Sequence, residues 1–162
     1  MNKVIIYTDG SIYPNPGVGG WAAVLLWKDV VHEISGGEKG PTTNNRMEML
    51  ALVEALKLLQ HPCKVTVYTD SQYLQRGVGD WNDGKPGDFR GYMVKWKSRG
   101  WMKTDKGEIL SIKNVDLWKQ LYDLTGDHAR IRMKWVKGHS GDPYNERCDV
   151  LASEARKVCA KT

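Results

Sequence analysis

The chain has 162 residues, of which 41% are hydrophobic and 27% charged, a composition typical of one soluble folded domain and not of a disordered chain. It holds neither an apolar run long enough for a transmembrane helix nor a secretory signal, so we expect a cytoplasmic protein. Its three cysteines form no CxxC pair, which argues against a disulfide framework and a cysteine-ligated zinc site.

The net charge of +5 is concentrated in one segment. Between Lys85 and Lys106 there are seven basic and two acidic residues, so the rest of the chain is neutral. A local basic patch predicts contact with a polyanion such as nucleic acid. The alternative is a solvated, positively charged helix with no ligand.

The first half of the chain predicts four strands and one helix. In chain order we expect strands over 4–8, 21–27 and 30–35, a helix over 46–60 and a strand over 65–69. A strand, a helix and a second strand in succession imply a right-handed crossover, which pairs strands 4–8 and 65–69 in parallel.

The second half predicts, in order, a short helix over 71–78, an irregular segment over 80–87, helices over 90–98 and 114–124, a strand over 130–136 and a final helix beginning near Pro143. Together these elements predict a single α/β domain over residues 1–162, with a five-stranded mixed β-sheet flanked by α-helices.

Acidic residues follow two of the predicted strands in the same Tyr-Thr-Asp pattern. Asp9 follows strand 4–8 and Asp70 follows strand 65–69. Because ligands of open α/β sheets bind outside the carboxyl ends of strands, parallel pairing would bring these carboxylates together. Glu48 and Asp149 lie in predicted helices beside apolar residues. Taken singly, Asp70 is explained as a helix cap and Asp9 as a turn residue.

Convergence of these four acids would have a chemical consequence. Clustered carboxylates raise each other's pKa unless a cation neutralises them. Oxygen ligands without cysteine or paired histidine favour Mg²⁺ or Mn²⁺. Two such ions about 4 Å apart can stabilise the attacking and the leaving oxygen of a phosphodiester. His139, in a glycine-flanked loop, has a side chain suited to proton transfer; the alternative is a surface histidine without a role.

Five motifs extend these observations over nearly the whole chain. They are Tyr7-Thr8-Asp9-Gly10-Ser11 with Asn15-Pro16-Gly17, Thr42-Thr43-Asn44-Asn45-Arg46-Met47-Glu48, Thr69-Asp70-Ser71-Gln72-Tyr73, Lys113-Asn114-Val115-Asp116-Leu117-Trp118, and Trp135-Val136-Lys137-Gly138-His139 continuing to Asn145-Glu146-Arg147-Cys148-Asp149. In this order they resemble type 1 ribonuclease H, the RNase HI family of bacteria and phages, over about 3–157. The resemblance implies an RNase H-like fold and an endonuclease that hydrolyses the RNA strand of RNA–DNA hybrids, leaving 5′-phosphate and 3′-hydroxyl ends.

The resemblance also implies the roles of the acids and the histidine. Asp9, Glu48, Asp70 and Asp149 would hold two Mg²⁺ ions, for which Mn²⁺ could substitute, and His139 would assist proton movement or product departure. The implied protein is a monomer that binds an RNA–DNA hybrid, needs no protein partner and binds no membrane.

Substrate contacts follow from the same resemblance. Contacts with the minor groove or the RNA backbone would come from Gly10, Ser11, Asn15, Asn44, Asn45 and Gln72. A phosphate of the DNA strand would be held by Thr43 and Asn114. In a basic protrusion over about 81–106, Lys95 and Lys97 would neutralise phosphates. Trp81 and Trp101 would stack on the substrate, with core packing as the alternative, whereas we expect core packing for Trp118 and Trp135.

The chain departs from the family's short form in three places, and two other functions stay open. Extra residues lie around 82–93 and 107–112, and Pro41 stands where some members carry an arginine that helps the DNA-phosphate pocket.

The fold alone does not separate this activity from that of a related DNA nuclease of the resolvase or transposase type. A non-catalytic hybrid-binding module is the third alternative, although it predicts a lost acid and all four are present.

Overall fold

The computed structural model describes residues 2–138 and 141–162. The strands are β1 (Lys3–Tyr13), β2 (Gly17–Trp27), β3 (Val30–Thr42), β4 (Lys64–Thr69), β5 (Gly79–Asn82), β6 (Lys85–Arg90), β7 (Met102–Asp105), β8 (Glu108–Ser111) and β9 (Arg130–Trp135). The helices are α1 (Asn44–Lys57), α2 (Gln72–Val78), α3 (Tyr92–Ser98), α4 (Val115–Gly126) and α5 (Pro143–Lys161). None of these described helices is both long and apolar enough to cross a membrane.

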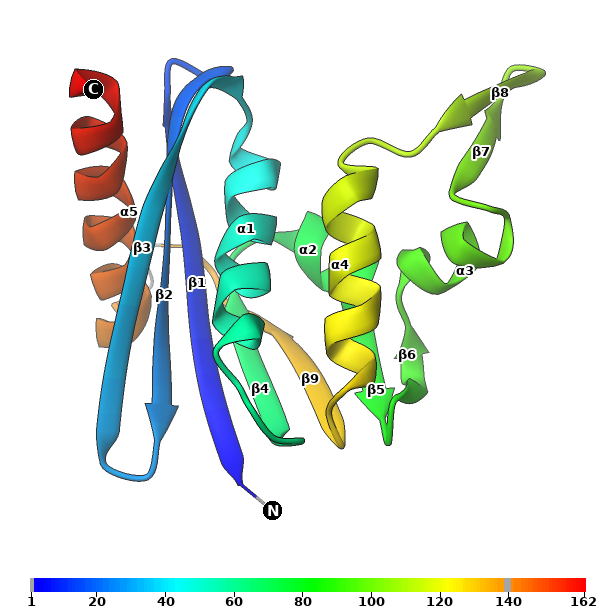
Figure 1. The fold of residues 1–162 in the computed structure, drawn as a ribbon, viewed down its shortest axis with the longest axis horizontal. Helices are drawn as coiled ribbons and strands as arrows, with labels where there is room; N and C mark the ends of the chain where they lie inside the picture. Colours follow the sequence, from blue (N-terminus) through cyan, green and yellow to red (C-terminus); the bar gives the residue numbers. More distant parts are fainter. Residues whose placement is uncertain (1, 139–140) are drawn as a thin grey trace.

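The main sheet is mixed, as the sequence predicts, and has the order β3-β2-β1-β4-β9-β5-β6. β1 pairs with β2 in antiparallel and with β4 in parallel orientation, and β4 pairs with β9 in parallel, so the predicted parallel pairing of the first and fourth strands is confirmed. In Figure 1, α5 lies against the β1–β3 end of the sheet, and α1 and α4 stand side by side over its middle.

Helices cover both faces of the sheet because β1 contributes side chains to two cores. Ile6 belongs to the larger core, with Leu52 of α1 and Trp118 of α4. Its neighbour Tyr7 belongs to a second core with Cys148 of α5. Successive side chains of a strand point to opposite faces, so the two cores lie on opposite sides of β1.

The predicted number of five strands is wrong. The described main sheet has seven strands, and β7 and β8 form a separate two-stranded ribbon, which projects from the molecule in Figure 1. The segment 80–87, expected to be irregular, forms most of the β5–β6 hairpin. Only Asp83 and Gly84 lie in the turn, both with positive φ angles, whereas Asp80 and Gly87 lie in the strands. The prediction of an irregular segment is therefore wrong except at this turn.

Two glycines allow the elements to approach closely. A Cβ atom on Gly77 of α2 would collide with the ring of Trp118 in α4. A Cβ atom on Gly10 of β1 would lie 2.8 Å from the Cβ of Met47 and 3.2 Å from the backbone nitrogen of Glu48. Glycine at position 10 therefore lets the first turn of α1 lie directly against β1.

We predict an acid-sensitive contact in the core at His128. This side chain is 4% exposed, and its Nδ1 accepts a hydrogen bond of 3.1 Å from the backbone N–H of Cys63, which requires the neutral ring. Burial lowers the pKa of His128. A lowered pKa gives stability that is present above the unfolded-state pKa, about 6.5, and is lost as the pH falls.

The expected result is a steeper loss of stability in the wild type than in His128→Asn as the pH falls from 7 to 5. The amide oxygen of asparagine can accept the same N–H without titrating. Between pH 7 and pH 5 we therefore expect the difference in free energy of unfolding between the two proteins to change by about 1 kcal/mol, since one pKa unit corresponds to about 1.4 kcal/mol. Urea unfolding at each pH measures it. Parallel curves for the two proteins would contradict the assignment.

Candidate active site

The register of two central strands brings Asp9 and Asp70 to one edge of the sheet. β1 and β4 pair in parallel as far as Tyr7 and Tyr68, and each aspartate lies two residues further along its chain. Asp70 follows the end of β4, as expected. Asp9 does not end its strand, because β1 continues to Tyr13 by pairing with β2, with Asp9 opposite Ala22.

Glu48 completes a cluster with these two aspartates. Its side chain comes from the start of α1 and is buried, with 2% exposure. The backbone N–H of Gly10 donates to Oδ1 of Asp9 at 2.9 Å and to Oε1 of Glu48 at 3.1 Å, so one donor joins the two carboxylates. Carboxylate oxygens of Asp9, Glu48 and Asp70 lie within 4.8 Å of one another.

The electrostatics of the cluster favour a bound cation. Burial, together with the charges of Asp70 and Asp149, raises the pKa of Asp9 to about 6. Burial and the charges of Asp9 and Asp70 raise the pKa of Glu48 well above its usual value. Among the described residues, the buried Oε2 of Glu48 has no hydrogen-bond partner. A buried carboxylate oxygen without a donor, in a cluster crowded by like charge, fits a hard divalent cation.

The fourth predicted acid, Asp149, stands apart from this cluster. It lies half-buried on α5, which packs against β1 through Cys148, whose thiol donates to the carbonyl of Tyr7 at 3.4 Å. Asp149 is close enough for its charge to raise the pKa of Asp9. Asp9, Glu48 and Asp70 thus form one cluster, and Asp149 lies outside it but close enough for its charge to act on Asp9.

A surface hollow of about 380 Å³ adjoins the acids. It is lined by Asn44, Asn45, Glu48, Asp70, Ser71, Gln72, Tyr73 and Trp135. Three residues predicted to touch the substrate, Asn44, Asn45 and Gln72, therefore share one hollow with two of the acids. A polar hollow beside clustered carboxylates is a suitable place for a polar, charged substrate.

Trp135 and Tyr73 line the polar hollow, although neither was among the predicted site residues. Trp135 was expected in the core, but it is 44% exposed, and its indole N–H donates to the carbonyl of Asp70 at 3.0 Å. It is the last residue of β9, paired with Thr69 directly before Asp70. Its place at a strand end was the available signal; the apolar character of the side chain suggested burial instead.

Four other predicted contact residues lie on β1, in the turn after it, or directly before helices α1 and α4. Ser11 follows Gly10 on β1, and its Oγ accepts from Nε of Arg156 at 3.0 Å. Asn15 is exposed in the turn between β1 and β2. Thr43 caps α1 by accepting from the backbone N–H of Arg46, and Asn114 is the residue that precedes the first turn of α4.

The basic protrusion is partly as expected. Lys95 and Lys97 are exposed on α3, and Nζ of Lys97 lies 4.2 Å from the ring centroid of Tyr122. Trp101 is partly buried, with its ring edge-on to the same tyrosine. Lys95 and Lys97 therefore lie at the surface, whereas Trp101 is packed against the core.

The expectation that Trp81 stacks on the substrate is wrong. Trp81 is 1% exposed, and its indole N–H donates to the carbonyl of Val78 at 2.8 Å. The side chain belongs to β5, which pairs with β9 and so turns the ring into the core. A ring with no accessible face cannot stack on a ligand. Trp118 is buried, as expected.

His139 lies outside the described residues. The residue before it, Gly138, is described and lies against Asp70, since a Cβ atom at this position would be 2.9 Å from Oδ2 of the aspartate. The segment that leads to His139 therefore passes beside the acid cluster.

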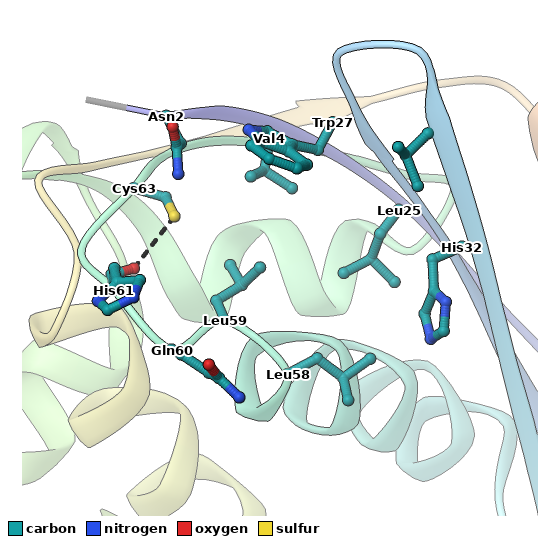
Figure 2. Close-up of a pocket in the computed structure, with 11 residues that line it drawn as sticks. Asn2, Val4, Leu25, Trp27, His32, Leu58, Leu59, Gln60, His61 and Cys63 are labelled. Carbon is teal, nitrogen blue, oxygen red and sulfur yellow. Dashed lines mark hydrogen bonds between the residues drawn. The ribbon is translucent and has the colours of Figure 1, made fainter.

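A second hollow, of about 410 Å³, differs in character. Its lining includes Val4, Leu25, Trp27 and Leu58, and none of its described lining residues is acidic. Figure 2 shows these apolar side chains with His32 and His61 around the opening, and the thiol of Cys63 donating to the carbonyl of His61. It lacks the carboxylates that distinguish the cluster around Asp9.

Comparison with known proteins gives concordant matches over nearly the whole chain. The sequence profile of the RNase H family matches residues 1–157. A Ribonuclease H of Paracidovorax citrulli is 50% identical over 156 residues, which is 95% of this chain and 94% of the relative. A Ribonuclease HI of Caulobacter vibrioides is 49% identical over 156 residues, covering 94% and 91%.

Solved structures show the same fold. LC9-RNase H1, a type 1 RNase H with the type 2 active-site motif, matches with a TM-score of 0.79 and 25% identity over 98% of this chain and 74% of its own. LC11-RNase H1, solved in complex with an RNA/DNA hybrid, matches with a TM-score of 0.64 and 22% identity over 98% of this chain and 99% of its own.

We predict that Asp9→Asn stabilises the protein in the absence of divalent ions. A raised pKa means that the carboxyl group destabilises the fold as the pH rises from about 4 through about 6. Two pKa units correspond to about 3 kcal/mol, so removing the charge should add roughly 2 kcal/mol at pH 8 and nothing near pH 4. Unfolding in EDTA measures this. Glu154→Gln, an exposed change on α5, is the control; equal effects of the two changes would refute the crowding of charge at Asp9.

Proposed function

The chain belongs to the RNase H family and is a ribonuclease H enzyme, and from this premise we propose that it hydrolyses the RNA strand of RNA–DNA hybrids. The observation that carries the proposal is the cluster of Asp9, Glu48 and Asp70, whose oxygens lie within 4.8 Å of one another beside a polar hollow. A relative of the same fold was solved with an RNA/DNA hybrid bound, which supports this substrate class.

We propose two divalent ions, Mg²⁺ or Mn²⁺, held by these three acids and Asp149. The donor-free Oε2 of Glu48 and the raised pKa of Asp9 support a cation between the carboxylates. When bound, such ions lower the pKa of a water molecule and stabilise the charge on a departing 3′-oxygen, which gives 5′-phosphate and 3′-hydroxyl products. The chain's own contribution is the rigid placement of the ligands by β1, α1 and the end of β4.

The polar hollow would select the RNA strand. The amides of Asn44, Asn45 and Gln72 offer both donors and acceptors to 2′-hydroxyl groups, which distinguish RNA from DNA in the shallow minor groove. Gly10, Ser11 and Asn15 extend this surface along β1 and the turn after it. His139, from the segment that follows Gly138, would move protons or assist product departure.

The DNA strand would lie over the starts of α1 and α4 and along the basic protrusion. Thr43 and Asn114 would hold one of its phosphates, and Lys95, Lys97 and Trp101 would contact it further on. The whole function would reside in one domain of residues 1–162, acting as a monomer. A DNA nuclease of related fold, or a binding module without catalysis, would use the same surfaces, and the substrate test below separates them.

Asp70→Asn should abolish turnover while leaving the fold intact. Loss of one ligand carboxylate should slow cleavage by at least about two orders of magnitude, the scale of removing one electrostatic stabiliser of a transition state. The assay uses an end-labelled RNA–DNA hybrid with Mg²⁺, beside duplex DNA, duplex RNA and single-stranded RNA, and EDTA should stop it.

Cleavage of only the RNA strand of the hybrid, lost in Asp70→Asn, is the expected outcome. Cleavage of DNA would instead assign the protein to the DNA nucleases of the same fold. Binding without cleavage would refute the catalytic assignment, and normal activity in Asp70→Asn would refute the metal ligand.

Reversal of Lys95, Lys97 and Arg99 to glutamate should raise KM for the hybrid and flatten its dependence on salt. These side chains are exposed on and after α3. Each lost phosphate contact lowers the slope of log affinity against log salt by about 0.9, so a total change of one to three is expected. Steady-state kinetics at several salt concentrations measures both quantities.

The matched control reverses three exposed lysines far from α3, namely Lys28, Lys157 and Lys161. It makes the same change in net charge. If both variants shifted KM and the slope equally, the basic protrusion would be a solvated surface and not a substrate contact.

A further inference from the structure

We propose that Arg46 is a positioning residue that sets the spacing between the starts of α1 and α4, and thereby the two side chains that hold the DNA-strand phosphate. This inference rests on the proposed function, because it takes Thr43 and Asn114 as the phosphate contacts. It adds a residue that touches no substrate and acts through those that do.

The guanidinium of Arg46 joins three elements through three hydrogen bonds. Its Nη1 and Nη2 donate to the two oxygens of Asp116, at 3.0 and 2.8 Å. Its Nε donates to Oε1 of Glu38 at 3.0 Å. Arg46 lies in the first turn of α1, Asp116 in the first turn of α4 and Glu38 on β3, so the planar group fixes all three relative to one another. A two-bond fork restricts both distance and orientation.

The fork lies next to both proposed phosphate contacts. Thr43 precedes Arg46 by one helical turn and accepts its backbone N–H at 3.3 Å, and Asn114 precedes Asp116 by two residues. In Figure 1, α1 and α4 run in the same direction with their starts at the same end. Helix starts carry partial positive charge and favour anions. The affinity for a phosphate that contacts two helix starts therefore depends on the distance between them.

The charge balance argues against direct phosphate binding by Arg46. Two carboxylates surround one guanidinium, so the group as a whole is negative. The contacts with Asp116 and Glu38 raise the pKa of Arg46, and Arg46 lowers the pKa of Asp116, as expected for a strongly paired cation. Three of its five N–H groups already donate to these carboxylates.

The network can stabilise the fold, since a bidentate pair and a third charge exceed an ordinary surface ion pair, although the 56% exposure of Asp116 limits the gain. A purely stabilising role predicts no change in KM for a folded variant. The spacing of two binding groups has a larger effect on function, because displacements of about 1 Å can change rates or affinities many-fold. The geometry therefore points to placement of the contacts.

Asp116→Asn tests the proposal because charge and geometry predict opposite results. The variant breaks the charged fork, so positioning predicts a KM for the hybrid about five- to tenfold higher with kcat within about twofold. It also removes a negative charge near the phosphate, so electrostatics alone predicts a lower KM. Asp123→Asn, an exposed change two turns further along α4, makes the same charge change and should leave KM unchanged or slightly lower.

Two further variants separate positioning from unfolding. Arg46→Lys keeps the charge but cannot bond both partners as a fork, so it should raise KM like Asp116→Asn, with assays run below the unfolding temperature of each variant. Thr43→Ala should raise KM less in the Asp116→Asn background than in the wild type, since the same contact is already misplaced.

The outcomes are distinguishable. A wild type that neither binds nor cleaves the hybrid would overturn the proposed function and this inference with it. A wild type that cleaves the hybrid, with an unchanged or lower KM in Asp116→Asn, would overturn only the role of Arg46. The role of Arg46 would also be overturned if the change in KM of the double variant equalled the product of the changes in Thr43→Ala and Asp116→Asn alone.

Discussion

The structure depends on holding three carboxylates together against their mutual repulsion. Asp9, Glu48 and Asp70 come from three separate parts of the chain, and the repulsion between their charges opposes the cluster. Burial of Glu48 and the crowding of charge raise pKa values and so cost folding free energy. What compensates is packing: α1 lies against β1 at Gly10, whose single N–H binds two of the acids, and the cores on both faces of β1 fix the strand in place.

The surroundings of the cluster are arranged for a polyanion held by positive groups at a distance from the acids. The acids form a negative centre suited to a divalent cation, whereas the lysines of α3 lie on a surface further out. This separation solves a physical conflict, because carboxylates alone would repel a nucleic-acid backbone. Arg46 belongs to neither group; it is neutralised by its partners and links the elements that carry both.

Two tryptophans show how topology overrides residue type. Trp81 and Trp135 have the same side chain, yet one is 1% and the other 44% exposed. Trp81 sits on β5 within the sheet, where pairing with β9 turns its ring into the core. Trp135 is the last residue of β9, where its indole N–H donates to the carbonyl of Asp70. Position along a strand, and not hydrophobicity, decided which of the two lines the site.

The sequence by itself determined the α/β class, the central parallel pairing, the long helices and the acids, because apolar periodicity and strand-end carboxylates are local signals. It missed the β5–β6 and β7–β8 hairpins, because β6, β7 and β8 are almost wholly exposed and lack the alternating buried residues of β4 and β9. Only the tertiary structure decided that Asp9, Glu48 and Asp70 converge, that Asp149 stands apart, and that Arg46 bridges two helix starts. Those facts depend on register and packing between segments distant in sequence, which no local pattern specifies.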